Sequence, residues 1–308
     1  MMFLFTTESW SRRMVLAVSR RMLTRALVVV LAAVAVSCGN ESTPTPGFVV
    51  GAGDSLESGL LAEIYAGALA RTGLSVSVKN QLGDRADYLA ALDAGTVSLV
   101  GDHSGELLEF FDSGTQARTP AEVTKALHSS LPEGLVVADA ADGTDMRPRV
   151  LIPAAAAEGE QMRSLAARCA DLRAGTAPVP AVLRAPDAPI RVAGCDFRET
   201  ITLLDADDLR EALLDGRVQA GLLTGPAALA PHPLDGLTTL TDDDYALRAE
   251  NVLPVLRKGS LDALRLKKLN YVAGELTTDE LVEMIRRIRA GETSAGDAAR
   301  VWLDAHAL

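Results

Sequence analysis

Histidine and cysteine supply much of the catalytic and metal-binding chemistry of proteins, and this chain contains few of either. Its four histidines are scattered, and no His-x-x-x-His or Cys-x-x-Cys pair is present. A zinc site is therefore not expected. The Gly-x-Ser-x-Gly, Gly-x-x-x-x-Gly-Lys-Ser/Thr, His-Glu-x-x-His and Ser-x-x-Lys motifs are also missing. The sequence predicts neither an enzyme nor a bound cofactor or metal.

An acidic run, TDDDYALRAE at residues 241–250, contains three consecutive aspartates. It could hold a cation, but it lacks the ligand spacing of a calcium loop. A solvated charged segment is the commoner interpretation of such a run.

The stretch FVVGAGDSLESGLLAEIYAGAL, residues 48–69, reads as a strand, a Gly-x-Gly turn and a helix. A dinucleotide-binding fingerprint would need a third glycine where Leu56 stands, and an acidic residue near Asn80 and Gln81. Both are missing, so a nucleotide site is not expected. We predict instead that Asp54 caps the helix and that Glu57 completes a capping box.

Two segments share the pattern Ala-Leu-x-x-Gly-x-Val: AALDAGTVSLV at 90–100 and EALLDGRVQAGLL at 211–223. Each predicts a helix that ends at a left-handed glycine, Gly95 or Gly216, followed by a buried strand. Such units are common in α/β proteins, but their repetition favours two related halves. Further helix-start signals at Thr119, Thr277 and Ser294 alternate with strands. Alternating strands and helices predict a mostly parallel sheet in each half.

The first 37 residues do not belong to this folded body. Five arginines precede an apolar run at 26–36 that is short for a membrane span and ends near Cys38. This arrangement predicts a secretion signal over 1–37. AVAVSC resembles a bacterial lipobox, so Cys38 is the expected lipidation site. SRRMVLA also resembles a twin-arginine export signal, although Met14 and Met22 are alternative starts.

Residues 38–46 are polar and proline-rich, and we expect them to form a tether. The full chain has a formal charge of −11, and residues 1–37 carry five Arg and one Glu, so the remainder carries −15. Such an acidic body argues against binding to nucleic acids or anionic lipids, which requires Lys and Arg. After export to an oxidising compartment, Cys169 and Cys195 are expected to form a disulfide.

Several motifs resemble the substrate-binding proteins of ABC importers for glycine betaine, choline and related osmoprotectants. GAGDSLESGLLAEIYAGAL is similar to the opening of that family, with Asp54 and Glu57 at its Asn and Glu positions. VGDHSG, at 100–105, takes the place of a family Tyr-Pro-Glu-Tyr-Thr-Gly motif. DDDYALRAENVLPVLR, at 242–257, and the later GELTTDELVEM also match. The similarity runs from about Val49 to Leu308.

The resemblance implies an α/β, two-lobed periplasmic-binding-protein type II fold that closes on a solute. Lobe I would comprise 47–148 plus 243–308, and lobe II would comprise 149–242 and contain both remaining cysteines. The protein would be a lipid-anchored monomer on the outer face of the bacterial cytoplasmic membrane. Its partners would be a small polar solute and the permease and ATPase subunits of an importer.

Family members that bind quaternary ammonium use a cage of tyrosines, whose ring faces attract the cation. The matching positions here are His103, Asp145, Thr224 and Glu250. These polar residues favour a hydrogen-bonding pocket, and we expect glycine betaine to bind weakly or not at all. Asp54 is a fifth candidate ligand-binding residue. Two other classes stay open: a ligand-sensing receptor without a transport role, and a secreted hydrolase.

Overall fold

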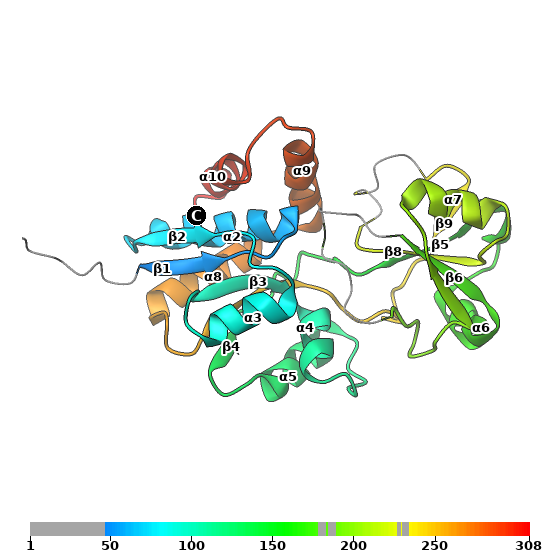
Figure 1. The fold of residues 1–308 in the computed structure, drawn as a ribbon, viewed down its shortest axis with the longest axis horizontal. Coiled ribbons are helices and arrows are strands. Elements are labelled where there is room, and N and C mark those ends of the chain that lie inside the picture. The colour runs from blue at the N-terminus through cyan, green and yellow to red at the C-terminus, as the bar shows by residue number, and fades with distance from the viewer. Residues whose placement is uncertain (1–46, 178–182, 184–188, 227–228, 230–233) are drawn as a thin grey trace, which may run out of the picture. The chain divides into compact units, whose positions relative to one another are not determined.

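The computed structural model describes residues 47–177, 183, 189–226, 229 and 234–308. The expected signal peptide, the tether and Cys38 lie outside the described residues. Within the described part the chain forms two five-stranded sheets with flanking helices (Figure 1). The α/β class is thus confirmed.

The first sheet has the order β2-β1-β3-β10-β4. Its strands are β1 (Phe48–Gly51), β2 (Val76–Lys79), β3 (Leu99–His103), β4 (Leu135–Val137) and β10 (Val252–Arg257). The second sheet has the order β7-β6-β8-β5-β9. Its strands are β5 (Arg149–Pro153), β6 (Arg173–Ala177), β7 (Glu199–Thr202), β8 (Ala220–Leu223) and β9 (Leu237–Thr239). The chain passes between the two sheets through residues 138–148 and again through 240–251.

Both sheets are mixed, whereas mostly parallel sheets were expected. In each sheet two pairings are parallel and two are antiparallel. The antiparallel pairs involve β10 and β5, the strands that follow the two passages between the sheets. The repeated helix-glycine-strand unit explains only the parallel pairings of each sheet. It carries no information about the direction of β5 and β10, which begin after the chain has crossed from the other sheet.

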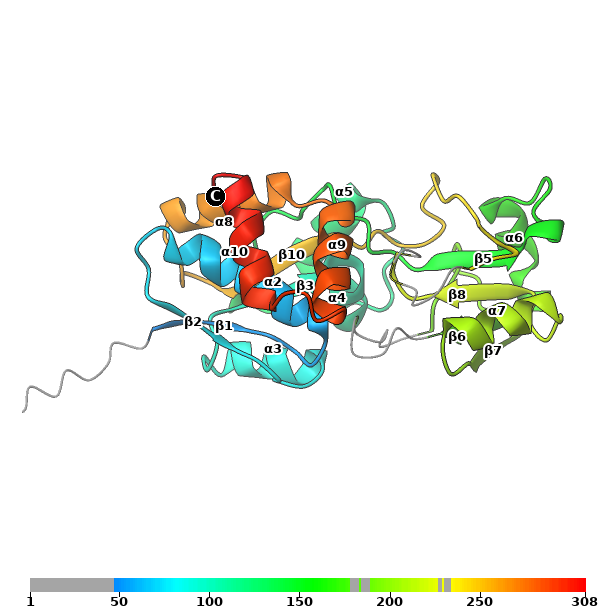
Figure 2. The same ribbon diagram turned by 90° about the horizontal axis from the view of Figure 1, so that it is seen from above.

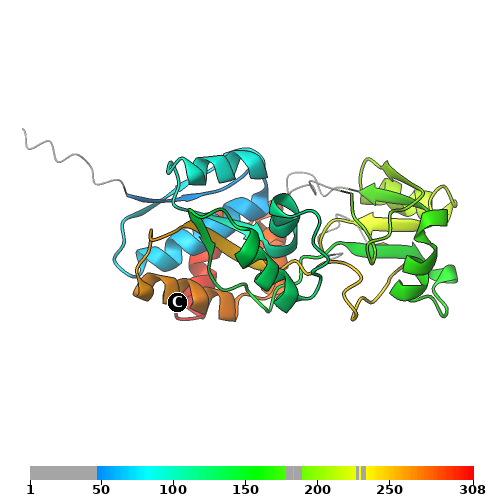
Figure 3. The same ribbon diagram turned by 90° about the horizontal axis from the view of Figure 1, so that it is seen from below.

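Helices cover both faces of the first sheet. They are α2 (Leu56–Ala70), α3 (Arg85–Asp93), α4 (Ser104–Phe111), α5 (Pro120–Ser130), α8 (Ala263–Glu275), α9 (Thr278–Arg289) and α10 (Ala295–Ala305). One core contains α2, α8, α9 and α10 together with Leu99, and α10 crosses α2 in Figure 2. The other contains α3, α4 and α5 together with Val100, and α4 and α5 lie in front in Figure 3. Successive residues of a strand thus point into the helix layers on opposite faces of the sheet.

The second sheet carries α6 (Met162–Arg168), α7 (Ala206–Leu214) and two short 3-10 turns, η1 (Ala154–Ala156) and η2 (Cys169–Asp171). Cys169 and Cys195 form the expected disulfide, with their Cα atoms 6.3 Å apart. The bond ties the turn at 192–195 to the end of α6.

The predicted repeat is confirmed as a structural unit. Gly95 (φ +73°) ends α3 before β3, and Gly216 (φ +79°) ends α7 before β8. β3 and β8 each occupy the central position of their sheet. Both glycines have the left-handed conformation, which residues with a Cβ rarely adopt.

Three of the predicted helix starts are confirmed: Thr119, Thr277 and Ser294 each cap the following helix through their side chain. The prediction for α2 was wrong. Ser55, not Asp54, caps that helix by accepting a hydrogen bond from the Ser58 amide. Glu57 points to His103 instead of back to the cap, because a buried carboxylate gains more from a charged partner than from an amide. Among the described residues, no helix is long and apolar enough to cross a membrane.

Candidate functional site

A buried polar cluster lies where β3 ends and α4 begins. Asp102 accepts two hydrogen bonds from Arg85, at 3.0 Å from Nε and 2.7 Å from the second nitrogen, and one at 2.8 Å from the Tyr88 hydroxyl. The side chains of Arg85 and Asp102 are only 1% and 3% exposed. Burying both charges is costly unless every polar atom finds a partner, and the paired geometry provides this. Arg85 also contacts Glu106 at 3.0 Å.

His103, the last residue of β3, forms an ion pair with Glu57 of α2. The distance from Nε2 to Oε1 is 2.8 Å, and the two side chains are 14% and 4% exposed. Burial acts to lower the pKa of His103, but the charge and hydrogen bond of Glu57 outweigh it. Glu250 and Glu106 act in the same direction as Glu57, so the pKa is raised to about 9. His103 is therefore cationic at neutral pH.

Glu250 lies on the second passage between the sheets, just before β10. Its carboxylate lies at the N-terminus of α4. Its Oε2 accepts hydrogen bonds of 3.0 Å from the amides of Gly105 and of Glu106. A side chain at Gly105 would collide with the Ala249 carbonyl and with Glu250 itself. Burial, followed by the charge of Glu106, raises the pKa of Glu250 to about 8, although His103, the Glu106 amide and Arg85 oppose this. Glu250 thus titrates near neutral pH.

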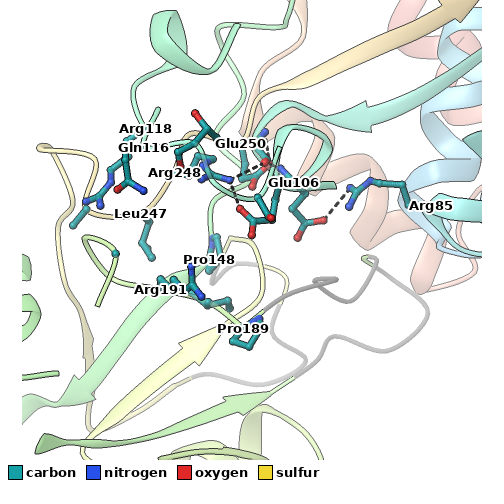
Figure 4. A pocket seen from close by; sticks show the side chains of 17 residues that line it. Arg85, Glu106, Gln116, Arg118, Pro148, Pro189, Arg191, Leu247, Arg248 and Glu250 are labelled. Atoms are coloured by element: carbon teal, nitrogen blue, oxygen red, sulfur yellow. Dashed lines mark hydrogen bonds and ion pairs between the residues drawn. The ribbon is translucent and has the colours of Figure 1, made fainter. Parts of the chain in front are cut away.

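A cavity of about 140 Å³ opens beside this cluster (Figure 4). Its wall includes Arg85, Glu106 and Glu250 from the cluster, and Arg118, Arg191 and Arg248 from other segments. The described lining contains no Phe, Tyr or Trp. Because drug-sized ligands occupy pockets of about 300–1,000 Å³, a space of this size suits a small solute.

Of the five ligand-binding residues predicted from the sequence, the structure brings His103 and Glu250 together in the cluster. Asp54 lies apart and is exposed. Its carboxylate accepts from the Gly83 amide at 3.1 Å, while its own amide donates to the Gly83 carbonyl. It therefore fixes the turn before α3 and does not cap α2.

Asp145 lies on the first passage between the sheets. It does not line the 140 Å³ cavity, but it lines a second pocket that Glu250 also borders. Arg147 donates to it at 2.9 and 3.0 Å, and Arg149 lies 3.2 Å away. Burial acts to raise the pKa of Asp145, but the hydrogen bond and charges of the two arginines outweigh it and lower the pKa. Arg147 also pairs with Asp242 at 3.0 Å and stacks 4.5 Å from the Tyr245 ring centre. Asp145 is thus already neutralised by the chain.

Thr224 follows β8 and is 7% exposed. Its Oγ1 has no hydrogen-bond partner in the part of the chain that the structure describes. A buried hydroxyl without a partner costs free energy. Thr224 does not line the cavity beside Glu250.

Sequence reasoning missed Arg85, Glu57 as a partner of His103, and Arg118. The sequence did indicate that a cation lies near Asp102, because Asp102 stands in the apolar strand of VGDHSG and a buried carboxylate requires a cation. No local pattern identified that cation as Arg85, which lies on α3. Among the described residues, no group of three or more His, Cys, Asp or Glu side chains could hold a metal ion.

Residues 48–305 match the model of the OpuAC family, the substrate binding domain of ABC-type glycine betaine transport systems. The chain belongs to this family. Similar folds include the crystal structure of a glycine betaine/carnitine/choline ABC transporter protein, at 16% identity and a TM-score of 0.62. Apo YehZ from Escherichia coli is 18% identical, with a TM-score of 0.58. Each comparison covers 84% of this chain and 98% of the other. No curated protein sequence matches the chain.

OpuAC proteins are solute-binding domains and not enzymes. They bind small ligands outside the cytoplasm and work with the permease and ATPase subunits of ABC transporters. The expected resemblance and the two-lobed binding-protein fold class are therefore confirmed.

Proposed function

We propose that this OpuAC protein is a lipid-anchored receptor that captures a small polar solute and delivers it to an ABC permease. The supporting observation is the buried charged cluster of Glu57, His103 and Glu250 at the carboxyl end of the central strand β3. Ligands of open α/β sheets bind at the carboxyl ends of strands. The lobes would be 47–148 plus 243–308 and 149–242, and the protein would act as a monomer.

The solute would be held by hydrogen bonds and charge. Charged side chains from several segments line the cavity beside Glu250, and a quaternary ammonium group cannot donate to them. Asp54, Asp145 and Thr224 stay candidates for ligand contact. Thr224 has the strongest support, because its buried hydroxyl still has a free hydrogen-bonding capacity within the described chain.

A signal peptide over 1–37, lipidation at Cys38 and a tether over 38–46 would place the receptor on the outer face of the cytoplasmic membrane. The C38A variant tests this directly. We expect it to leave the membrane fraction and lose the mass of the lipid. The proposal would be contradicted if C38A stayed in the membrane fraction and the wild-type protein had the mass of the unlipidated chain.

The alternative role is a ligand-sensing receptor without transport. The two roles differ in what deletion does to the cell: loss of a transport receptor abolishes uptake of its solute, whereas loss of a sensor leaves uptake intact and changes a response.

A thermal-shift screen tests solute capture itself. Ligands that bind the folded state raise Tm in proportion to the logarithm of concentration over Kd, so weak binders also register. The screen compares amino acids, polyamines, sugars and polyols with quaternary amines. We expect stabilisation by a solute with N–H or O–H donors. If none of these classes shifts Tm, the proposed function is wrong.

A further inference from the structure

The four arginines on the cavity wall differ in whether their guanidinium groups have acidic partners. Arg85 is paired with Asp102 and Glu106. Arg248 contacts Glu109 at 2.6 Å, and Arg191 contacts Asp196 at 2.8 Å. A fourth arginine, Arg118, shows no hydrogen bond or ion pair of its guanidinium anywhere in the described chain.

The backbone of Arg118 is nevertheless firmly held. Its amide donates to Glu122 at 3.1 Å, and its carbonyl accepts from the amide of Ala249 at 2.8 Å. Its guanidinium lies against the tight turn at 192–195, since a side chain on Gly194 would come within 2.8 Å of it. A half-buried guanidinium that makes no direct ion pair in the described chain, although its charge acts on Glu122, is suited to bind a carboxylate by a two-pronged hydrogen bond.

The acidic side of the cavity is formed by Glu106 and Glu250. Figure 4 shows Arg118 and Gln116 toward one end of the drawn cavity and Glu106 toward Arg85 at the other. Glu250 is 7% exposed, and only its Oε2 is engaged by the α4 amides. Carboxyl oxygens are hydrogen-bond acceptors, so this side suits a group with N–H donors.

We propose that the cavity binds a small zwitterion, with its carboxylate on Arg118 and a primary or secondary ammonium group at Glu106 and Glu250. This inference rests on the proposed function and names its solute class. A simple anion would meet the two carboxyl groups, and a simple cation would meet Arg118 without compensation. A trimethylated ammonium would match the charge but could not donate a hydrogen bond to either carboxyl group, so it would lose that part of the binding free energy.

The test uses three matched pairs of solutes that differ only in methylation: glycine, β-alanine and 4-aminobutyrate, each against its N-trimethyl form. The series also varies the distance between the two charges. In calorimetric titrations of the full-length protein, we expect the N–H form of the best-fitting pair to bind at least about tenfold more tightly than its trimethyl partner. Equal or tighter binding of the trimethyl form overturns the assignment of a primary or secondary ammonium group but leaves solute capture intact. Failure of all six to bind also overturns it, and the wider screen then decides the proposed function separately.

The R118Q variant tests the carboxylate contact. We expect at least about a tenfold loss of affinity for the best N–H solute, with partial recovery in R118K, which keeps the charge but loses the planar fork. R286Q is the charge-matched control, because Arg286 is an exposed residue of α9 that pairs with Glu283. An unchanged affinity in R118Q, at an unchanged Tm of the ligand-free protein, would refute the role of Arg118.

Discussion

His103 and Thr224 occupy the same position in the two copies of the repeated helix-glycine-strand unit. Each lies at the same distance along the chain from its left-handed glycine, Gly95 or Gly216, and each stands at the carboxyl end of the central strand of its sheet. The two differ in how their polar groups are satisfied. His103 is paired with Glu57 at 2.8 Å, whereas the buried Oγ1 of Thr224 lacks a partner in the described chain.

The T224V variant separates stability from binding. Valine has the same shape and removes the unpaired hydroxyl, so we expect the free energy of unfolding to stay unchanged or rise by about 1 kcal/mol. Affinity for the solute should fall if the hydroxyl contacts it. T202V is the control, because Thr202 is exposed on β7. Denaturant titration measures the first effect, and a loss of more than about 1 kcal/mol in T224V would show that the hydroxyl has a partner.

Stability should fall as the pH rises from neutral to alkaline. The pKa of His103 rises from 6.5 in the unfolded chain to about 9 in the folded one. Its contribution is therefore complete below pH 6.5 and is lost as the pH passes through 9, for a total of up to about 3 kcal/mol. Glu250, whose pKa rises from 4.5 to about 8, acts in the same direction between those two values, because the folded state again binds more protons.

H103Q keeps a hydrogen-bond donor for Glu57 but removes the titrating ring. We expect its unfolding free energy to vary less between pH 6.5 and 9 than that of the wild type. H128Q is the matched control, because His128 is exposed on α5. Identical pH profiles for H103Q and the wild type would contradict the ion pair.

Solute binding should strengthen with pH if Glu250 ionises to receive a cation. With a pKa of about 8, the ionised fraction of Glu250 rises by about eightfold from pH 7 to pH 8.5. E250Q still offers an oxygen to the α4 amides but cannot ionise. We expect a weaker affinity that does not vary over this range, measured by calorimetry in buffers of different ionisation enthalpy. Wild-type affinity that is independent of pH would contradict the role of Glu250.

The disulfide should contribute measurably to stability. Cys169 is fully buried and the bond closes a segment with a sequence separation of 26. A loop of that size is expected to contribute about 3–4 kcal/mol in the chain-entropy picture. The double variant C169A/C195A should lose that much in denaturant titration, and a loss of less than about 1 kcal/mol would show that the bond is dispensable.

Local signals in the sequence predicted the parts of the fold that depend on neighbours along the chain. Thr119, Thr277 and Ser294 were identified as caps because each acts within its own turn. Gly95 and Gly216 were identified because only the backbone conformation at that position matters. The mixed strand directions could not be predicted in this way, because they depend on where β5 and β10 arrive after crossing from the other sheet.

Some residues of the candidate site were also identified from the sequence, whereas their contacts were not. His103 and Glu250 were chosen through family resemblance, and the structure brings them together. Arg85 and Asp102 are 17 positions apart, and Glu57 and His103 are 46 apart. Contacts over such distances follow from packing and carry no local pattern. Asp54 was chosen as the cap of α2 in place of Ser55, because the two neighbouring residues are equally good caps.

The most direct test of a polar site in place of an aromatic cage is calorimetric titration of the wild-type protein with glycine betaine, beside the best solute from the screen. We expect micromolar or tighter binding of a solute with N–H or O–H donors and no measurable micromolar binding of glycine betaine. Micromolar affinity for glycine betaine would contradict it.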